Sequence, residues 1–250
     1  MKKLMVAFSA VALCGAVFAE DITSANVVGY QTYTAHAGYN LYSPTFIGLS
    51  GNKKLDIQSI KIPNADGWGC EQIWVINEDG TAVTGDTYTY KSTAAGEDVD
   101  GWWDDTNDKF AELEITEGQG FYIYCDSDEK EFQVSGEVKI GKFTTTLHSS
   151  YNYTGNFCPV KLSIQDFKLL NSQGWGCEQI WEMNEDGTAV TGNTYTWMSE
   201  EAGEDKDGWK DDSTGEDATV EFEPGEGLFF YCDGEDVVIE LPEVIPAPTK

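Results

Sequence analysis

Four tryptophans stand beside glycines at repeated positions of the chain. Trp68 and Trp175 each lie between two glycines, and Trp102 and Trp209 each follow an Asp-Gly pair. A glycine-flanked indole ring in a loop can offer a flat face for stacking on a sugar, while nearby Asp and Asn side chains accept hydrogen bonds from the sugar hydroxyls. These rings are therefore a candidate carbohydrate-binding set. The alternative is that they fill the core, where most tryptophan area is buried.

Aspartates gather in the loops next to two of these tryptophans, and Ca²⁺ favours several carboxylate oxygens in one loop. The candidate ligands are Asp98, Asp100, Asp104, Asp205, Asp207 and Asp211. An EF-hand is excluded, because placing Gly101 at its glycine leaves Gly96 and Asn107 at the first and last ligand positions. An irregular calcium site and a solvated acidic turn are the two interpretations left. No other cofactor is indicated.

Five cysteines follow the N-terminal segment, and four of them recur in pairs. Cys70 and Cys125 correspond to Cys177 and Cys232, which predicts one disulfide inside each repeat if the protein is exported to an oxidising compartment. Cys158 has no counterpart. It is either a buried thiol or the partner in an intermolecular bridge.

No motif of a catalytic site is present. The chain lacks His-Glu-x-x-His, Gly-x-Ser-x-Gly, a P-loop and a strand-linked Gly-x-Gly-x-x-Gly. The two histidines, His36 and His148, are single residues at matching positions, and a structural or surface role is expected for both. A pair of neighbouring carboxylates does not indicate a catalytic site in a chain with 44 acidic residues. We therefore expect a non-catalytic protein.

A long internal repeat organises the chain. The segment from Gly67 to Asp126 matches the segment from Gly174 to Asp233 at a constant offset of 107, with 37 of 60 positions identical. The sequence thus predicts two tandem domains, at residues 20–138 and 139–243, followed by a Pro-rich tail at 244–250. A period above 100 residues indicates duplication of a whole domain and not a solenoid.

The first 19 residues have the pattern of a secretory signal peptide. Lys2 and Lys3 precede an apolar run that ends at Ala19. No later stretch is long and apolar enough to predict a membrane span. We expect a secreted, periplasmic or cell-surface protein after cleavage of residues 1–19.

The charge balance narrows the choice of partners. The 250 residues carry 15 basic and 44 acidic side chains, for a net charge of −29, and include no arginine. Binding to nucleic acid needs clustered Lys and Arg, so it is excluded as a function. Glycans or envelope proteins remain as candidate partners.

Strand patterns dominate the sequence. Short runs rich in Val, Ile, Thr, Tyr and Trp alternate with turns, as expected for antiparallel sheets. The predicted strands of the first repeat are Val27 to Thr34, Tyr39 to Tyr42, Glu71 to Ile76, Thr81 to Tyr90, Phe110 to Ile115, Gly120 to Cys125 and Glu131 to Val138. The best helical candidate is a single turn within 163–170, with a counterpart at 56–62. The predicted fold is all-β, with two duplicated antiparallel domains of sandwich or barrel type.

Several short motifs carry a family resemblance. They are Ser24-Ala25-Asn26-Val27-Val28-Gly29-Tyr30, Gly38-Tyr39-Asn40-Leu41, Gly118-Gln119-Gly120-Phe121-Tyr122-Ile123 and Val134-Ser135-Gly136-Glu137-Val138. The chain resembles secreted two-copy β-rich proteins of bacteria of the Verrucomicrobia, Lentisphaerae and Planctomycetes group. The resemblance implies an exported, non-catalytic protein and supplies no site residues.

The expected function is a structural or binding role at the cell envelope or outside the cell. A carbohydrate-binding module that uses the loop tryptophans is the first alternative. A secreted hydrolase is the second, and it would need a pocket that joins two carboxylates with a raised pKa.

Overall fold

The computed structural model describes residues 28–49, 54–77, 79–126, 128–172, 174–184 and 190–245. The predicted signal peptide and residues 246–250 of the predicted tail lie outside these ranges. The part of the chain that is described is all-β. Its helices are 3-10 turns of three residues, η2 (Ile57–Ser59), η3 (Thr93–Ala95), η4 (Ile164–Asp166) and η5 (Glu200–Ala202), and none could cross a membrane.

The first half of the chain contains strands β1 to β11. Their bounds are β1 (Val28–Ala35), β2 (Gly38–Tyr42), β3 (Lys54–Asp56), β4 (Ile60–Lys61), β5 (Glu71–Ile76), β6 (Val83–Lys91), β7 (Gly101–Asp104), β8 (Lys109–Phe110), β9 (Glu114–Thr116), β10 (Phe121–Cys125) and β11 (Lys130–Glu137). They form a six-stranded sheet of order β2-β10-β5-β6-β7-β8, a three-stranded sheet of order β1-β11-β4, and the pair β3-β9.

The second half contains strands β12 to β21. Their bounds are β12 (Phe143–Leu147), β13 (Ser150–Gly155), β14 (Leu162–Ser163), β15 (Lys168–Leu169), β16 (Trp175–Met183), β17 (Val190–Met198), β18 (Gly208–Asp211), β19 (Glu221–Phe222), β20 (Gly227–Cys232) and β21 (Val237–Leu241). They form a five-stranded sheet of order β13-β20-β16-β17-β18, a three-stranded sheet of order β12-β21-β15, and the pair β14-β19. Each of these sheets therefore has a counterpart in the first half.

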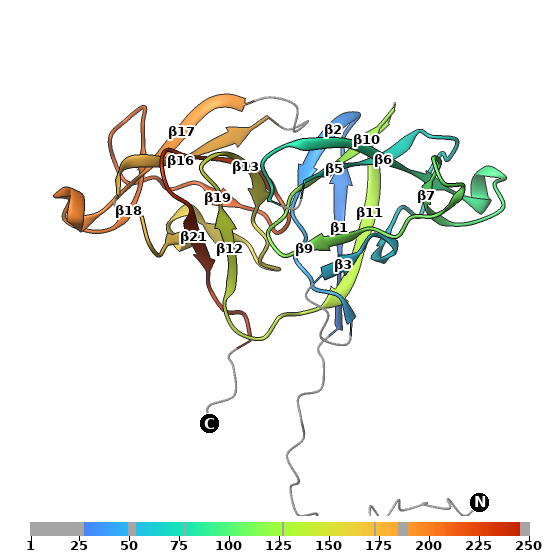
Figure 1. Ribbon diagram of the computed structural model, residues 1–250, viewed down its shortest axis with the longest axis horizontal. Helices are drawn as coiled ribbons and strands as arrows, with labels where there is room; N and C mark the ends of the chain where they lie inside the picture. Colours follow the sequence, from blue (N-terminus) through green and yellow to red (C-terminus); the bar gives the residue numbers. More distant parts are fainter. Residues whose placement is uncertain are drawn as a thin grey trace, which may run out of the picture.

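The four larger sheets have a propeller-like, four-bladed arrangement. Figure 1 shows the two halves side by side, with the six- and five-stranded sheets toward the top and the three-stranded sheets below them. Each half has its own buried core. Trp102 and Phe132 lie in the first core, and Trp209 and Phe230 lie in the second.

All but one of the predicted strands agree with the structure apart from their ends. Strand β5 has the predicted bounds, and the turn after it closes with a hydrogen bond from Gly80 N to Asn77 O of 2.9 Å. The predicted strand from Phe110 to Ile115 is in fact two short strands, β8 and β9, because Ala111 turns inward between them and its N–H donates to Trp102 O. The predicted helical turns are the 3-10 turns η2 and η4.

The two halves meet where a Gly-x-Gly segment of each half presses on a strand of the other. A Cβ on Gly120 would lie 2.8 Å from the backbone oxygen of Tyr153, and a Cβ on Gly227 would lie 2.3 Å from that of Leu41. Neither glycine has a positive φ, so close approach of the backbones is what requires glycine here. A hydrogen bond from Gly120 N to Tyr153 O of 3.0 Å crosses the contact.

The predicted disulfides are wrong. All of the cysteines in the described ranges are free thiols. The strand register explains this, because Cys125 on β10 lies opposite Glu71 and not opposite Cys70. Neighbouring residues of a strand point to opposite faces, so a register offset of one residue separates the two thiols. The same offset sets Cys232 opposite Glu178 in the second half. The unmatched Cys158 is completely buried, as in the buried-thiol interpretation.

We predict that Gly227→Ala and Gly120→Ala destabilise the protein by about 2–3 kcal/mol, because the added methyl group meets backbone atoms that cannot move freely. Urea denaturation measures the effect. Gly141→Ala is the control. Gly141 has a φ of +93° and open space where a Cβ would be added, so this variant measures the cost of backbone strain without crowding. Equal losses in all three variants would contradict the crowding argument.

We predict that two thiols react with a maleimide in the native protein and three react only after unfolding. Cys70 and Cys177 are partly exposed, whereas Cys125, Cys158 and Cys232 are buried. Burial raises the pKa of the Cys125 and Cys232 thiols to about 12, which further suppresses their thiolates. Mass spectrometry counts the labels. A Tm that falls when reductant is added would instead point to disulfides.

Candidate functional site

The outer face of the large sheets carries aromatic rings. In β5 and β10, Ile73 and Ile123 are fully buried in the core, while their neighbours Trp74 and Tyr122 are partly exposed. Side chains of a strand alternate between its two faces. The alternation that builds the core therefore also sets rings on the opposite face of the same sheet.

Strand register brings the rings of the first half together. Tyr122 lies directly opposite Trp74 in the sheet. Tyr39 on β2 contacts both rings edge to face, with centroids 5.3 Å from Trp74 at 80° and 6.2 Å from Tyr122 at 87°. These three rings and Val83 line a hollow of about 270 Å³. The hollow is therefore walled mainly by aromatic carbon.

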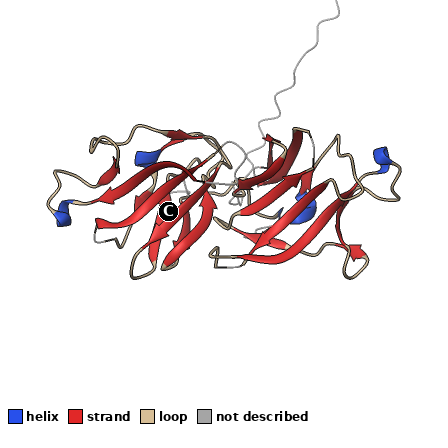
Figure 2. Cartoon of the chain, turned by 90° about the horizontal axis from the view of Figure 1, so that it is seen from above, coloured by secondary structure: helices blue, strands red, loops and turns tan. Residues whose placement is uncertain are grey.

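The second half continues the same surface. Phe229 on β20 lies opposite both Tyr153 on β13 and Trp181 on β16, with ring centroids 4.9 and 6.2 Å away respectively. At the junction of the halves, the rings of Tyr122 and Tyr153 are 6.0 Å apart. We call Trp74, Tyr122, Tyr153, Phe229 and Trp181 the aromatic row. Figure 2 views from above the sheets that carry it.

Polar groups border the aromatic row on equivalent strands. The indole N–H of Trp74 donates to Gln72 Oε1 at 3.1 Å, and that of Trp181 donates to Gln179 Oε1 at 2.9 Å. Thr194 lies opposite Trp181 in the sheet, as its counterpart lies opposite Trp74. Both indoles are thus held in place at their polar edge.

A second feature is the cleft between the halves, with a volume of about 710 Å³. Strand β1 supplies Tyr33 to it and the connection between β1 and β2 supplies His36, while the second half supplies Glu182 and Glu226. Burial, followed by the charges of Glu182 and Glu223, raises the pKa of the Glu226 carboxyl to about 7. The Oε2 atom of Glu226 accepts a hydrogen bond from Glu223 N at 2.8 Å.

The equivalent turn of the first half carries Gln119 in place of Glu226. Its Oε1 accepts from Thr116 N at 2.9 Å, as the Glu226 carboxylate does from Glu223 N, and its amide group donates to Ile76 O at 2.7 Å. Gln119 lines a smaller cleft of about 180 Å³ between the halves. At this matching position, one cleft therefore has a carboxyl group and the other has a neutral amide.

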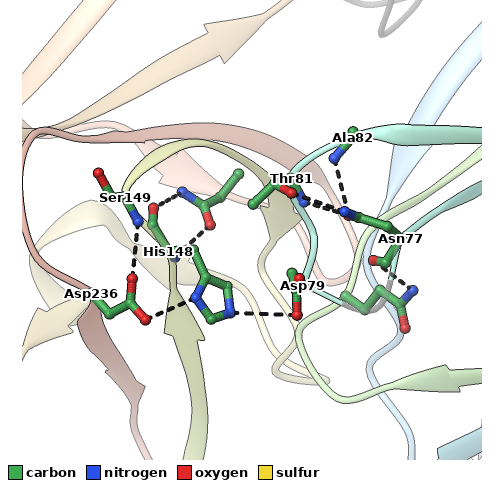
Figure 3. Close-up of polar contacts among 9 residues, drawn as sticks. Asn77, Asp79, Thr81, Ala82, His148, Ser149 and Asp236 are labelled. Carbon is green, nitrogen blue, oxygen red and sulfur yellow. Dashed lines mark hydrogen bonds and ion pairs between the residues drawn. The ribbon is translucent and has the colours of Figure 1, made fainter.

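His148 lines the smaller cleft and joins the two halves. Its Nδ1 is 2.9 Å from Asp236 Oδ2, and its Nε2 is 3.9 Å from Oδ1 of Asp79 in the β5-β6 turn (Figure 3). Asp236 also accepts a hydrogen bond from Ser149 N, and these two contacts hold the pKa of its carboxyl below the usual value. His36 has a similar contact, with its Nδ1 3.2 Å from Glu129 Oε2. These contacts are consistent with the structural role expected for both histidines.

Two of the four predicted sugar-binding tryptophans are not available to a ligand. Trp102 and Trp209 are 0% exposed, and their indole N–H groups donate to Ile60 O and Phe167 O, both at 2.8 Å. The glycine before each ring begins a strand, and the first side chain after it points into the core. For these two residues the carbohydrate-binding prediction is wrong, and the alternative, that the rings fill the core, is confirmed.

The other two predicted tryptophans are exposed, Trp68 in a loop and Trp175 as the first residue of β16. Trp68 is 73% exposed and Trp175 is 63% exposed. Trp68 has a φ of 55° and is held by a hydrogen bond from its indole to Ala95 O of 3.2 Å. In the described ranges, neither ring contacts another aromatic ring, so they are isolated platforms.

Aspartates of the acidic loops are hydrogen-bonded within their own loops. Asp100 accepts from Thr93 N at 2.8 Å, Asp207 accepts from Glu200 N at 2.9 Å, and Asp104 accepts from the Asn107 side chain at 2.7 Å. Among the described residues, no three His, Cys, Asp or Glu side chains converge on a point that could hold a metal ion. The structure therefore gathers neither the three candidate calcium ligands of the first loop, Asp98, Asp100 and Asp104, nor those of the second, Asp205, Asp207 and Asp211, around one point.

The aromatic row was not predicted from the sequence, although the sequence carries a signal for it. Trp74 follows Ile73 in one predicted strand, and Tyr122 precedes Ile123 in another. An aromatic residue recurs at the positions of Trp74 and Tyr122 in the second repeat. An aromatic residue at every second position of a strand whose other positions are aliphatic indicates two apolar faces, of which only one can face the core.

Comparisons with known proteins add no relative to this description. No protein-family model matches the chain, and neither the curated proteins nor the solved structures yield a match.

We predict that Glu226→Gln stabilises the protein above pH 7 and leaves its stability unchanged below pH 4.5. The folded-state pKa of about 7 lies above the ordinary value of 4.5. The free energy of unfolding of the native chain therefore falls as the pH rises between these values, and the loss is complete above the upper one. Urea denaturation across this range measures the difference.

Gln119→Glu is the matched control, because it places a carboxylate in the equivalent turn and should lower stability at neutral pH. A Glu226→Gln variant that is no more stable than the native chain at pH 8 would show that the carboxyl is not penalised by its surroundings.

Proposed function

We propose that this protein is an exported, non-catalytic carbohydrate-binding protein whose ligand lies along the aromatic row. The observation that supports this is the continuity of the rings across both halves, with Tyr122 and Tyr153 6.0 Å apart at the junction. Export rests on the predicted signal peptide at residues 1–19.

The chemistry of the aromatic row suits sugars. The C–H groups on one side of a pyranose ring are apolar and pack on an aromatic ring, while the hydroxyls at its edge need hydrogen-bonding partners. The row offers both, because Trp74 and Trp181 are bordered by Gln and Thr side chains. An open sheet face also admits a chain of any length, whereas a closed pocket would not.

The repeat supports the same proposal. We infer that the two halves descend from one duplicated domain of sandwich type, since the six-stranded and five-stranded sheets share their strand order from β2 or β13 inward. Duplication would set two weak aromatic platforms on one rigid support, and two linked sites gain affinity for a repetitive ligand.

A secreted hydrolase is the second candidate, and Glu226 is the observation that favours it. Glycoside hydrolysis needs one protonated and one ionised carboxyl group. Glu226, with its pKa of about 7, and Glu182 line the same cleft. The test is release of reducing ends from any bound glycan, which hydrolysis would produce and Glu226→Gln would abolish. Binding without release favours the non-catalytic function.

We predict that the double variant Trp74→Ala/Trp181→Ala binds polysaccharide about tenfold more weakly or worse, since a lost ring contact costs about 0.5–1.5 kcal/mol. Affinity electrophoresis in gels that contain neutral polysaccharides, preceded by a glycan array, measures binding. Far-UV circular dichroism and Tm confirm that the variant is folded.

Trp68→Ala/Trp175→Ala is the matched control, because it removes two exposed indoles outside the aromatic row and should leave affinity unchanged. If this control loses binding and the first variant keeps it, Trp68 and Trp175 are the site and the aromatic row is not.

A further inference from the structure

Carboxylates flank the aromatic row in both halves. Asp105 accepts from Thr89 Oγ1 at 2.7 Å, and Asp212 accepts from Thr194 Oγ1 at 2.6 Å. Thr194 is the residue opposite Trp181, and Thr89 is opposite Gln72, the partner of the Trp74 indole. The hydroxyl contacts hold both carboxylates against β6 and β17, the strands that pair with those carrying Trp74 and Trp181.

A third carboxylate lies beyond the end of β10, the strand that carries Tyr122. Asp126, just after β10, accepts from the hydroxyl of Tyr124 at 3.2 Å. None of these three carboxylates takes part in an ion pair with another side chain of the described ranges. The protein as a whole carries a net charge of −29, so its long-range field also attracts cations and repels anions.

The same sheet face already holds one ammonium group against an indole. Lys91 Nζ lies 4.2 Å from the ring centroid of Trp103, and Trp103 is opposite Thr89 in the sheet. An ammonium group over an aromatic face is attracted by the ring quadrupole. This part of the face can therefore accommodate a cation together with a ring.

The geometry of the row points to a chain and not to a single sugar. The ring contacts that link its members across the junction and through the second half have centroid separations of 4.9 to 6.2 Å, and they cross from one half to the other without a gap. A monosaccharide would cover one ring and leave the others exposed. A linear ligand would cover the rings of both halves at once.

We propose that the aromatic row is a track for a linear glycan whose sugars carry free amino groups, with sugar rings stacked on the aromatic rings and ammonium groups paired with Asp105, Asp126 and Asp212. This inference rests on the proposed carbohydrate-binding function and names the ligand class. Charge complementarity selects amino sugars over neutral sugars, and the acidic surface excludes glycans made of uronic acids.

The test is calorimetric titration of the full chain with three probes at low salt and at a pH where the amines are protonated. The probes are the hexamer of glucosamine, the hexamer of N-acetylglucosamine and the dimer of glucosamine. We expect the glucosamine hexamer to bind about tenfold more tightly than its acetylated form, because only its ammonium groups can pair with the three carboxylates. We expect the difference to shrink as salt is added.

Two variants separate the parts of the proposal. Asp105→Asn/Asp212→Asn should remove much of the preference for free amines and keep the binding of the acetylated hexamer. Tyr153→Leu, which keeps bulk at the junction and removes the ring, should lower the affinity for the hexamer and not that for the dimer.

The outcomes are distinguishable from failure of the proposed function. Equal binding of the two hexamers overturns the amino-sugar assignment, and equal binding of the dimer and hexamer of glucosamine overturns the continuous track. Failure of every glycan, neutral or charged, to bind would instead overturn the carbohydrate-binding function itself.

Discussion

The close approach of the two halves at their Gly-x-Gly segments is the constraint on which the rest of the structure depends. Gly120 and Gly227 let the backbone of each half reach a strand of the other, where any Cβ would collide with a carbonyl oxygen. This contact sets the large sheets beside each other and brings Tyr122 next to Tyr153. It also creates the two clefts, so the aromatic row and the clefts share one origin.

Each large sheet serves two purposes because its side chains alternate. The inward set, exemplified by Ile73 and Ile123, fills the core, and the outward set forms the aromatic row. The rings are stabilised by one another, and their polar edges are satisfied by Gln72 and Gln179. A surface that is ordered before its ligand arrives loses little conformational entropy on binding, which favours affinity.

The two halves are alike in backbone and different in chemistry. At one matching position, Gln119 is satisfied by backbone groups, whereas Glu226 is a carboxyl whose pKa is raised by burial. A second pair of matching positions also differs. In the first half, Tyr39 and Tyr122 border an open hollow. In the second half, the rings of the equivalent residues, Tyr151 and Phe229, are stacked with an interplanar angle of 13°. Two platforms that differ in this way can contact successive sugars of one chain differently.

Much of this protein could be predicted from its sequence, because its strongest signals are local. Alternation and turn residues predicted an all-β chain and the bounds of β5, and the 107-residue offset predicted that the halves would match. The pairing of strands could not be predicted, because strand register is a tertiary property. It is the register that sets Glu71 opposite Cys125 and so separates two thiols that the repeat suggested as partners. For the same reason, the sequence identified tryptophans with a chemistry for sugar binding, but only the packing of the sheets decided that Trp102 is buried and that Trp74 faces solvent.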